Sequence, residues 1–212
     1  VRNQLYVRPD LVFLYDQVSV KNGVPTEHFH FPNQPTANGS NQWTVVNGSG
    51  QLQMAAIYPA VTASVTAQAV NSLKYSDGSM GPQVSSYHMT MTANTQNSYQ
   101  SFLNIFRAGL SSGYAAPSYQ TLSPSVGVGV RVTGMLSSEN ATPIVVIFAD
   151  NTQNSPSNSV QYSVVSSPGA YHYVALLQPN TAYQVSETVS NGQASIVITQ
   201  SASGNMKTDA AG

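Results

Sequence analysis

The hydrophobic positions of this chain recur in short runs that have the spacing of β-strands. The stretch LVFLYDQVSV at 11–20 is almost continuously apolar, which is typical of a strand buried on both faces. In EHFHF at 27–31, polar and apolar positions alternate, as in a strand with one solvated face. Similar runs follow at 42–46, 51–59, 61–70, 87–93, 126–136, 143–150, 159–166, 171–177, 182–189 and 194–200. The pattern predicts an all-β chain folded as an antiparallel β-sandwich.

Three local patterns refine this picture. The stretch NSYQSFLNIFRAGL at 97–110 has a spacing that also allows a helix, but its aromatic and β-branched residues favour a strand. The VGVGV stretch at 126–130 places glycine at alternate positions, which suits close packing or a bulge. Asp16 follows the apolar run LVFLY, and we expect its carboxylate to bond the backbone of the turn after it.

A segment rich in Gly, Pro and Ser, GLSSGYAAPSYQTLSPS at 109–125, marks the best boundary along the chain. It predicts a β-sandwich region over residues 1–116 and a smaller C-terminal antiparallel β subdomain over 117–212. A chain of 212 residues is long enough to bury a core in this arrangement without disulfides.

The composition favours a folded protein with a polar but uncharged surface. Charged residues make up only 7% of the chain and the net charge is −1, while 12 Tyr and 6 Phe are spread along it. Disordered chains usually combine high net charge with few aromatic residues, so this balance argues against disorder. Ser, Thr, Asn and Gln replace the missing charges, as we expect of an exported protein that is secreted, periplasmic or displayed at a cell surface.

Charge and hydropathy argue against a nucleic acid as partner and against a membrane-spanning segment. The seven basic residues are scattered, whereas nucleic-acid binding needs clustered Lys and Arg to neutralise phosphates. No apolar run approaches the roughly 20 residues that span a bilayer. The chain has no Cys, so it has neither a disulfide scaffold nor a thiolate metal site.

Histidines carry the first candidate chemistry. His28 and His30 lie two positions apart, so on a strand both imidazoles project from one face while Glu27 projects from the other. The pair could hold a metal or an anionic ligand, but a zinc site needs further ligands, and His88 and His172 could approach only through tertiary folding. The alternative is that these histidines bond to backbone or water. We expect no bound metal and no cofactor.

A catalytic apparatus is less evident. Elimination from a uronate polysaccharide needs a group that neutralises the carboxylate, a base and often a tyrosine acid. Tyr87-His88 and Tyr171-His172-Tyr173 contain suitable types, yet they also fit ordinary sheet positions. No pair of acidic residues is marked for glycoside hydrolysis, and no nucleophile elbow or phosphate loop is present. The sequence therefore predicts no catalytic residue within the chain.

Four segments resemble, in order, parts of heparinase II/III-type polysaccharide lyases. They are YVRPDLVFLYDQVSV at 6–20, EHFHFPNQP at 27–35, SFLNIFRAG at 101–109 and LLQPNTAYQVSETVSNGQASIVITQSASGNMKTDAAG at 176–212. The stretches VGVRVTG and IVVIFAD lie between the last two in the same order as in the family.

This resemblance implies a non-catalytic, C-terminal β-sandwich portion of an exported polysaccharide lyase. The β-elimination would then be carried by an upstream α/α toroid domain of the same protein, and the chain alone would be inactive. The family's His-x-His-x-Asp motif is not reproduced, because Phe31-Pro32 follows His30, so its metal role is not transferred to His28 and His30.

Two alternatives to this function stay open. One is a stand-alone carbohydrate-binding module in which exposed rings stack on sugars, with Trp43 and Tyr58, Tyr75 or Tyr87 as candidates. The other is a structural surface or filament subunit that assembles by β-strand donation. The expected partners are a polysaccharide and the upstream toroid domain of the same protein. The predicted polysaccharide contacts are His28, His30, Trp43, Tyr87 and His88.

A shorter stretch, LQPNTAYQV at 177–185, resembles the Leu-x-Pro-x-Thr-x-Tyr-x-Val element of fibronectin type III domains. There the tyrosine packs at a strand corner and bonds the backbone. The resemblance implies a structural role for Tyr183 in a sandwich of either kind.

Overall fold

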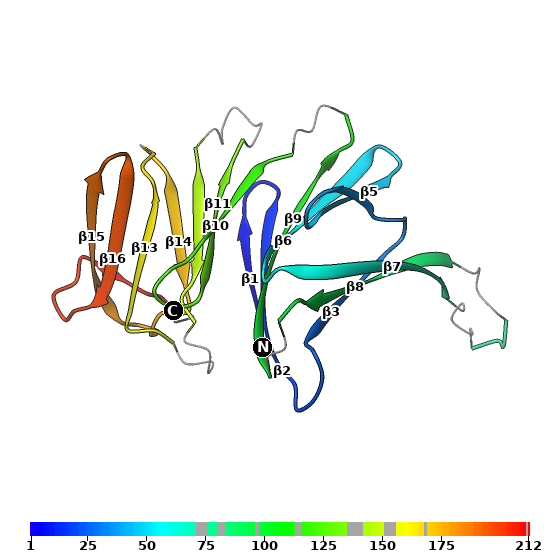
Figure 1. Cartoon of the computed structure of the whole chain (residues 1–212), viewed down its shortest axis with the longest axis horizontal. Coiled ribbons are helices and arrows are strands. Elements are labelled where there is room, and N and C mark those ends of the chain that lie inside the picture. Colours follow the sequence, from blue (N-terminus) through cyan, green and yellow to red (C-terminus); the bar gives the residue numbers. More distant parts are fainter. Residues whose placement is uncertain are drawn as a thin grey trace. The chain divides into compact units, whose positions relative to one another are not determined.

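The computed structural model describes residues 1–70, 76–79, 84–95, 98–112, 116–134, 142–150, 156–167, 169–210 and 212. Every regular element in these ranges is a β-strand, which confirms the predicted all-β class (Figure 1). The chain separates into two compact units, Val1–Tyr114 and Ala115–Gly212. The sequence predicted a boundary after residue 116.

The first unit is built from two antiparallel sheets. Its larger sheet has the order β1-β2-β9-β6-β5-β4 and its smaller sheet the order β3-β8-β7. The strands are β1 (Arg2–Val7), β2 (Leu11–Ser19), β3 (Thr26–Phe31), β4 (Thr36–Gly39), β5 (Gln42–Asn47), β6 (Gly50–Tyr58), β7 (Val61–Val70), β8 (Val84–Ala93) and β9 (Tyr99–Leu110).

A hydrophobic core joins the two sheets of the first unit. Alternate residues of β3, β8 and β7 point inward and meet residues from β5, β6 and β9 of the larger sheet. The cluster contains Phe31, Trp43, Val45, Met54, Ala56, Val61, Met89, Met91, Ala93 and Phe102. Packing of two antiparallel sheets around one apolar layer makes this unit a β-sandwich, as the alternation predicted.

The central strands of the larger sheet behave as the sequence indicated. In β2, Phe13 and Tyr15 on one face and Leu14 and Asp16 on the other are all buried, which confirms the strand buried on both faces. The stretch that also allowed a helix forms β9, a strand of 12 residues between β2 and β6.

The second unit also contains two sheets, with the orders β10-β11-β12-β14 and β13-β16-β15-β17. Its strands are β10 (Ser118–Leu122), β11 (Val128–Thr133), β12 (Ile144–Phe148), β13 (Ser159–Val165), β14 (Tyr171–Ala175), β15 (Ala182–Ser190), β16 (Gln193–Gln200) and β17 (Met206–Lys207). The expected antiparallel arrangement fails at one pair, because β12 and β14 are parallel. Between them in sequence, β13 joins the opposite sheet. The chain then comes back to the first sheet with β14 running in the same direction as β12.

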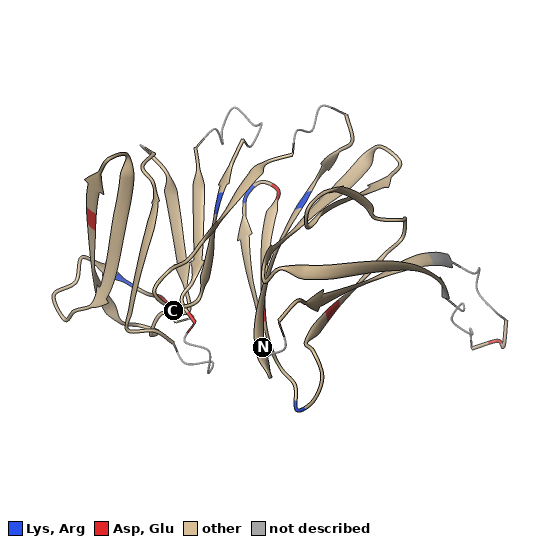
Figure 2. Ribbon diagram, in the orientation of Figure 1, with Lys and Arg blue, Asp and Glu red and all other residues tan. Residues whose placement is uncertain are grey.

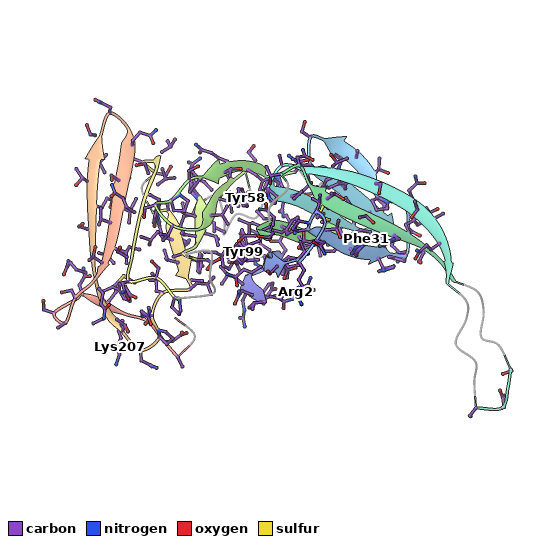
Figure 3. The ribbon with its side chains drawn as sticks, turned by 60° about the horizontal axis from the view of Figure 1, so that its bottom comes forward. Arg2, Phe31, Tyr58, Tyr99 and Lys207 are labelled. Carbon is purple, nitrogen blue, oxygen red and sulfur yellow. The ribbon has the colours of Figure 1, made fainter. Side chains whose placement is uncertain are left out.

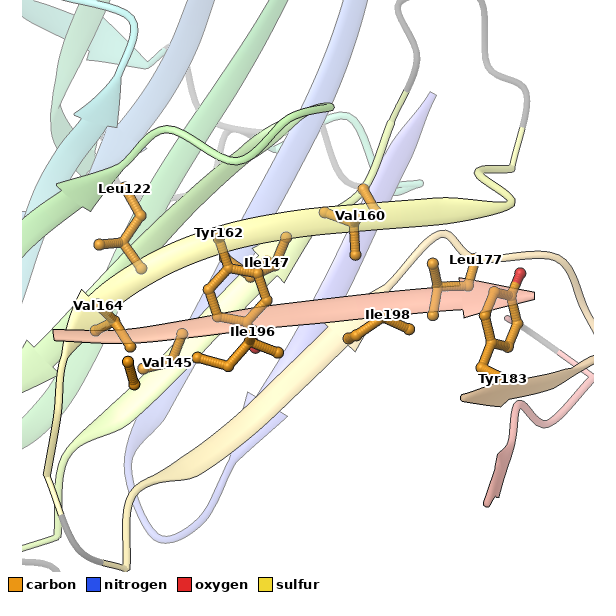
Figure 4. Packing of buried hydrophobic residues seen from close by; sticks show 12 residues of the cluster. Leu122, Val145, Ile147, Val160, Tyr162, Val164, Leu177, Tyr183, Ile196 and Ile198 are labelled. Atoms are coloured by element: carbon orange, nitrogen blue, oxygen red, sulfur yellow. The ribbon is translucent and has the colours of Figure 1, made fainter. Parts of the chain in front are cut away.

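Tyr183 anchors the core of the second unit (Figure 4). Its hydroxyl donates to the carbonyl of Ser157 at 2.9 Å and accepts from the backbone N–H of Gln178 at 2.9 Å. The predicted structural role of this tyrosine is confirmed. Leu177, Val160 and Ile198 belong to the same buried cluster.

The alternating glycines of VGVGV are required by close backbone approach. A Cβ on Gly127, which has φ +78°, would lie 1.8 Å from the carbonyl oxygen of Phe148. One on Gly129 would lie 2.3 Å from the side chain of Ile147. Both positions pack against β12, so larger residues would push that strand away.

Candidate functional site

The smaller sheet of the first unit has one apolar face and one polar face. Glu27, Phe29 and Phe31 of β3 point toward the core, so His28 and His30 point the other way, as the sequence predicted. In register, His30 lies opposite His88 on β8, and His88 lies opposite Thr66 on β7. The polar face is formed by Thr26, His28, His30, Thr62, Ser64, Thr66, His88, Thr90 and Thr92.

The three histidines of this face form a stack that we call the histidine row: His28, His88 and His30. The ring of His88 lies between the other two, with centroid distances of 5.0 Å to His28 and 4.7 Å to His30. The planes differ by only 16° and 15°. His28 Nδ1 and His88 Nε2 share a hydrogen bond of 2.9 Å, so one of these nitrogens carries a proton and the other accepts it.

Hydroxyl groups surround the histidine row. Thr26 Oγ1 lies 3.1 Å from His28 Nε2, and Thr90 Oγ1 lies 3.4 Å from His28 Nδ1. His28 and His30 are exposed and His88 is half-buried at the centre of the sheet. The result is an open surface of imidazoles and hydroxyls.

Crowding of the imidazoles affects their charge. The pKa of His88 is lowered from its ordinary value of 6.5, first by desolvation and then by repulsion from His30 and His28. The central ring is therefore held neutral more readily than a free histidine. An anion placed over the row would offset this repulsion and favour the protonated state.

The histidine row can form hydrogen bonds with a ligand, and it gains positive charge when its imidazoles become protonated. Its rings are nearly parallel but offset, because His28 and His88 also meet through a nitrogen–nitrogen hydrogen bond. The described ranges contain no group of three or more His, Cys, Asp or Glu arranged to hold a metal ion. The arrangement therefore fits an anionic, hydroxyl-rich ligand better than a metal centre.

The predicted aromatic contacts do not join the row. Trp43 is only 8% exposed and packs in the core, so the expectation that its ring stacks on sugar is wrong. Tyr87 lies opposite Phe31 in register and is half-buried on the apolar face. Tyr58 is partly exposed at the end of β6, and Tyr75 lies outside the described residues.

Beneath the row, on the inner side of β3, lies a buried acidic pair. Glu27, at 5% exposure, accepts a hydrogen bond from Asn104 Nδ2 at 2.7 Å and is hydrogen-bonded to Asp16. Asp16 in turn receives Arg2, whose Nε and terminal nitrogen lie 2.8 and 2.6 Å from its oxygens (Figure 3 labels Arg2). Asp16 therefore binds a side chain inside the sheet, and the expectation that it bonds the following turn is wrong.

Burial, then the hydrogen bond with Asp16, and to a smaller extent the Asp16 charge raise the pKa of Glu27 to about 8. At neutral pH Glu27 is thus protonated, and its Oε1, which has no partner as an acceptor, can donate to Asp16. The inward direction of Glu27 was visible in the alternation of EHFHF. Its partners were not, because Asn104 lies 77 positions away along the chain.

The second unit holds the remaining histidine. His172 on β14 bonds Tyr162 of β13 through Nδ1 and Oη at 2.8 Å, with ring centroids 5.8 Å apart. Its neighbours Tyr171 and Tyr173 point to the opposite face of the strand, which is the ordinary sheet arrangement that the sequence allowed for this stretch. Burial lowers the pKa of His172, and Glu187 opposes this shift.

No known protein family matches this chain, and no curated protein matches it. No helix in the described part of the chain is long and apolar enough to cross a membrane. Lys, Arg, Asp and Glu are sparse on the strands of both units (Figure 2). The histidine row places three ionisable side chains together on one strand face.

Proposed function

We propose that this chain is an acidic-polysaccharide-binding β-sandwich and forms the non-catalytic portion of an exported polysaccharide lyase. The observation that carries the proposal is the histidine row, three stacked imidazoles on an open sheet face lined with hydroxyls. The upstream toroid partner belongs to the proposal through the family resemblance alone.

The shape of the face supports a polymer as ligand. It is a sheet surface and not an enclosed pocket, so an extended chain of sugars can lie along it. Thr62, Ser64 and Thr66 of β7 add hydroxyls that pair with sugar hydroxyls. Because each uronate carries a carboxylate, the polymer also supplies the anion that the crowded imidazoles need to become charged.

Binding of a polyuronate to the histidine row should be coupled to the uptake of protons. The free row resists protonation at His88, and a bound carboxylate stabilises the imidazolium, so binding takes up protons. Affinity should therefore rise as the pH falls below about 6.5, the ordinary histidine value. Neutral polysaccharides should show no such dependence.

The test is titration of the full chain with a polyuronate and with a neutral glucan at about pH 5.5 and pH 7.5. We expect polyuronate affinity to be roughly tenfold higher at the lower pH, equivalent to ~1.4 kcal/mol, and to fall in His30→Gln and His88→Gln variants. His172→Gln, the same substitution at a histidine of the second unit, is the matched control and should leave polyuronate affinity unchanged. Equal affinity at both pH values, or histidine variants that bind like wild type, would overturn the proposal.

The same titration separates the second candidate. Binding of the neutral glucan without pH dependence would favour a stand-alone carbohydrate-binding module that uses hydroxyl and amide groups. The lyase part is tested separately, by following unsaturated uronate formation by ultraviolet absorbance, and we expect none from this chain alone.

A further inference from the structure

The second unit leaves the inward-facing side chains of strand β15 uncovered. Across the sheet β13-β16-β15, residues in register form the rows Val160–Ile198–Val185, Tyr162–Ile196–Glu187 and Val164–Ala194–Val189. The members on β13 and β16 are all buried (Figure 4). Those on β15 are not: Val185 is half-buried, Glu187 is exposed and Val189 is 56% exposed.

The facing sheet, β10-β11-β12-β14, does not extend over the inward-facing side chains of β15. Its edge strand β14 lies over β13, because His172 bonds Tyr162. Strand β15 is two positions further across its own sheet, roughly 9.6 Å at the usual strand spacing. In the described part of the chain no strand lies beside β14 on its outer side.

The outer edge of β14 is suited to pairing. Tyr171 N–H donates to Pro143 and the Ala175 carbonyl accepts from Ala149, so these residues use their backbone groups toward β12. In a parallel pair the alternate residues, His172 and Val174, direct their N–H and C=O groups to the other side. Their side chains point inward, beside the uncovered row.

A cleft of about 370 Å³ lies at this place, with a volume suited to buried side chains. His172 and Val174 form one wall, and Val185, Glu187, Ile196 and Ile198 form the other. The tail from Met206 to Asp209 closes the end near Tyr183. The two walls are mostly apolar, with Glu187 as the acid on the β15 side, and the tail adds Lys207 and Asp209 at its end.

That acid defines the charge of a partner. Glu187 occupies the centre of an otherwise apolar row, between Val185 and Val189, and takes part in no ion pair among the described residues (Figure 2 shows the acidic position on β15). A basic side chain above it would supply the missing counter-charge. Apolar side chains two positions before and after would cover the valines.

We propose that β14 accepts an extended segment of a partner protein as an additional strand, with the pattern apolar–any–basic–any–apolar. Its backbone pairs with His172 and Val174 in the manner of β-augmentation. The added strand lies one strand spacing beyond β14, roughly 4.8 Å, and therefore over β16. From there its inward side chains reach across the cleft to Val185 and Glu187, and beyond the cleft toward Val189. This interaction is independent of the polysaccharide surface of the first unit.

A second copy of these residues is not the occupant. None of the seven Lys and Arg has an apolar residue both two positions before and two positions after it; the nearest case, Arg107, has Ile105 but Gly109. The segment therefore lies outside these 212 residues.

The test uses a fluorescent nine-residue peptide, Ser-Thr-Val-Thr-Lys-Thr-Val-Thr-Ser, and a matched peptide with Glu in place of Lys. Fluorescence anisotropy with the full chain should show binding of the Lys peptide that is about five- to tenfold tighter than that of the Glu peptide. N-methylation of alternate backbone amides in the Lys peptide should abolish binding, because it removes the strand hydrogen bonds.

The variant Glu187→Lys should reverse the preference between the two peptides. Because Glu187 is exposed, the variant should keep the wild-type thermal midpoint, which circular dichroism checks. Asp77→Lys, an exposed change of equal charge in the first unit, is the control and should leave the preference unchanged. Equal binding of both peptides, no binding at millimolar concentration, or binding unaffected by Glu187→Lys would overturn the proposal.

Discussion

Asp16 and Glu27 show how the first unit tolerates two acids inside a sandwich. Asp16 forms an ion pair with Arg2, while Glu27 has only the neutral amide of Asn104 and the neighbouring acid. A second negative charge at this place would be repelled and poorly solvated, so a proton on Glu27 is the stable solution. The strand β3, which carries His28 and His30 of the histidine row, thus depends on a protonated carboxyl beneath it.

This arrangement predicts a pH-dependent stability. Glu27 has a pKa of about 8 in the folded chain and 4.5 ordinarily, so the folded state holds an extra proton between these values. Stability should therefore decrease as the pH rises from about 4.5 to about 8. Glu27→Gln, which is neutral at any pH, should stabilise the protein by about 2 kcal/mol at pH 8.5, the scale of a buried group left without a partner.

Urea unfolding at about pH 5 and pH 8.5 measures this effect. At the lower pH, Glu27 is protonated, so the variant and the wild type should have similar midpoints. The control is the reverse change at an exposed position of β7, Gln68→Glu, which should leave the midpoint unchanged at both pH values. A Glu27→Gln variant that loses stability at high pH would show that the carboxylate is the stabilising form.

Tyr183 gives a second prediction at this scale. Its hydroxyl satisfies the Ser157 carbonyl and the Gln178 N–H, both near the corner that leads into β15. Tyr183→Phe leaves these groups unpaired and should lower the free energy of unfolding by about 1–3 kcal/mol. Tyr171→Phe, at a 57% exposed position, should change it by less than about 0.5 kcal/mol. Equal effects of the two changes in denaturant unfolding would contradict the structural role.

Single residues also show where the sequence stops being informative. The shared face of His28 and His30 and the inward direction of Glu27 follow from strand alternation, which is local. The position of His88 beside them does not follow from the local sequence, because it depends on the pairing of strands 60 positions apart. The prediction of Trp43 as a sugar contact failed because pattern alone cannot separate a core aromatic from an exposed one.

At the scale of elements, apolar runs predicted strands well because their burial leaves a strong local signal. The run at 11–20 became a doubly buried strand, and the aromatic and β-branched content of 97–110 correctly outweighed its helical spacing. The parallel pairing of β12 with β14 was missed, since direction is decided by which sheet the intervening β13 joins. Short strands such as β17 carry too few residues for a pattern.

At the scale of the whole molecule, two β units carry different kinds of surface. The first exposes a polar sheet face with the histidine row, and the second exposes the apolar cleft beside β14 and β15. With a net charge of −1 spread over so few ionisable groups, long-range steering of ligands is weak. Recognition should therefore depend on these local groups, so binding at each surface should respond to point changes within it.

The most direct test of the central claim is the protonation of the histidine row itself. Proton NMR of the imidazole C–H signals, assigned with His28→Gln, His30→Gln and His88→Gln, follows each ring through a pH titration with and without a uronate oligosaccharide. We predict that the pKa of His88 lies below 6.5 in the free chain and rises when the oligosaccharide is present. A His88 pKa that is the same with and without the oligosaccharide would contradict the account.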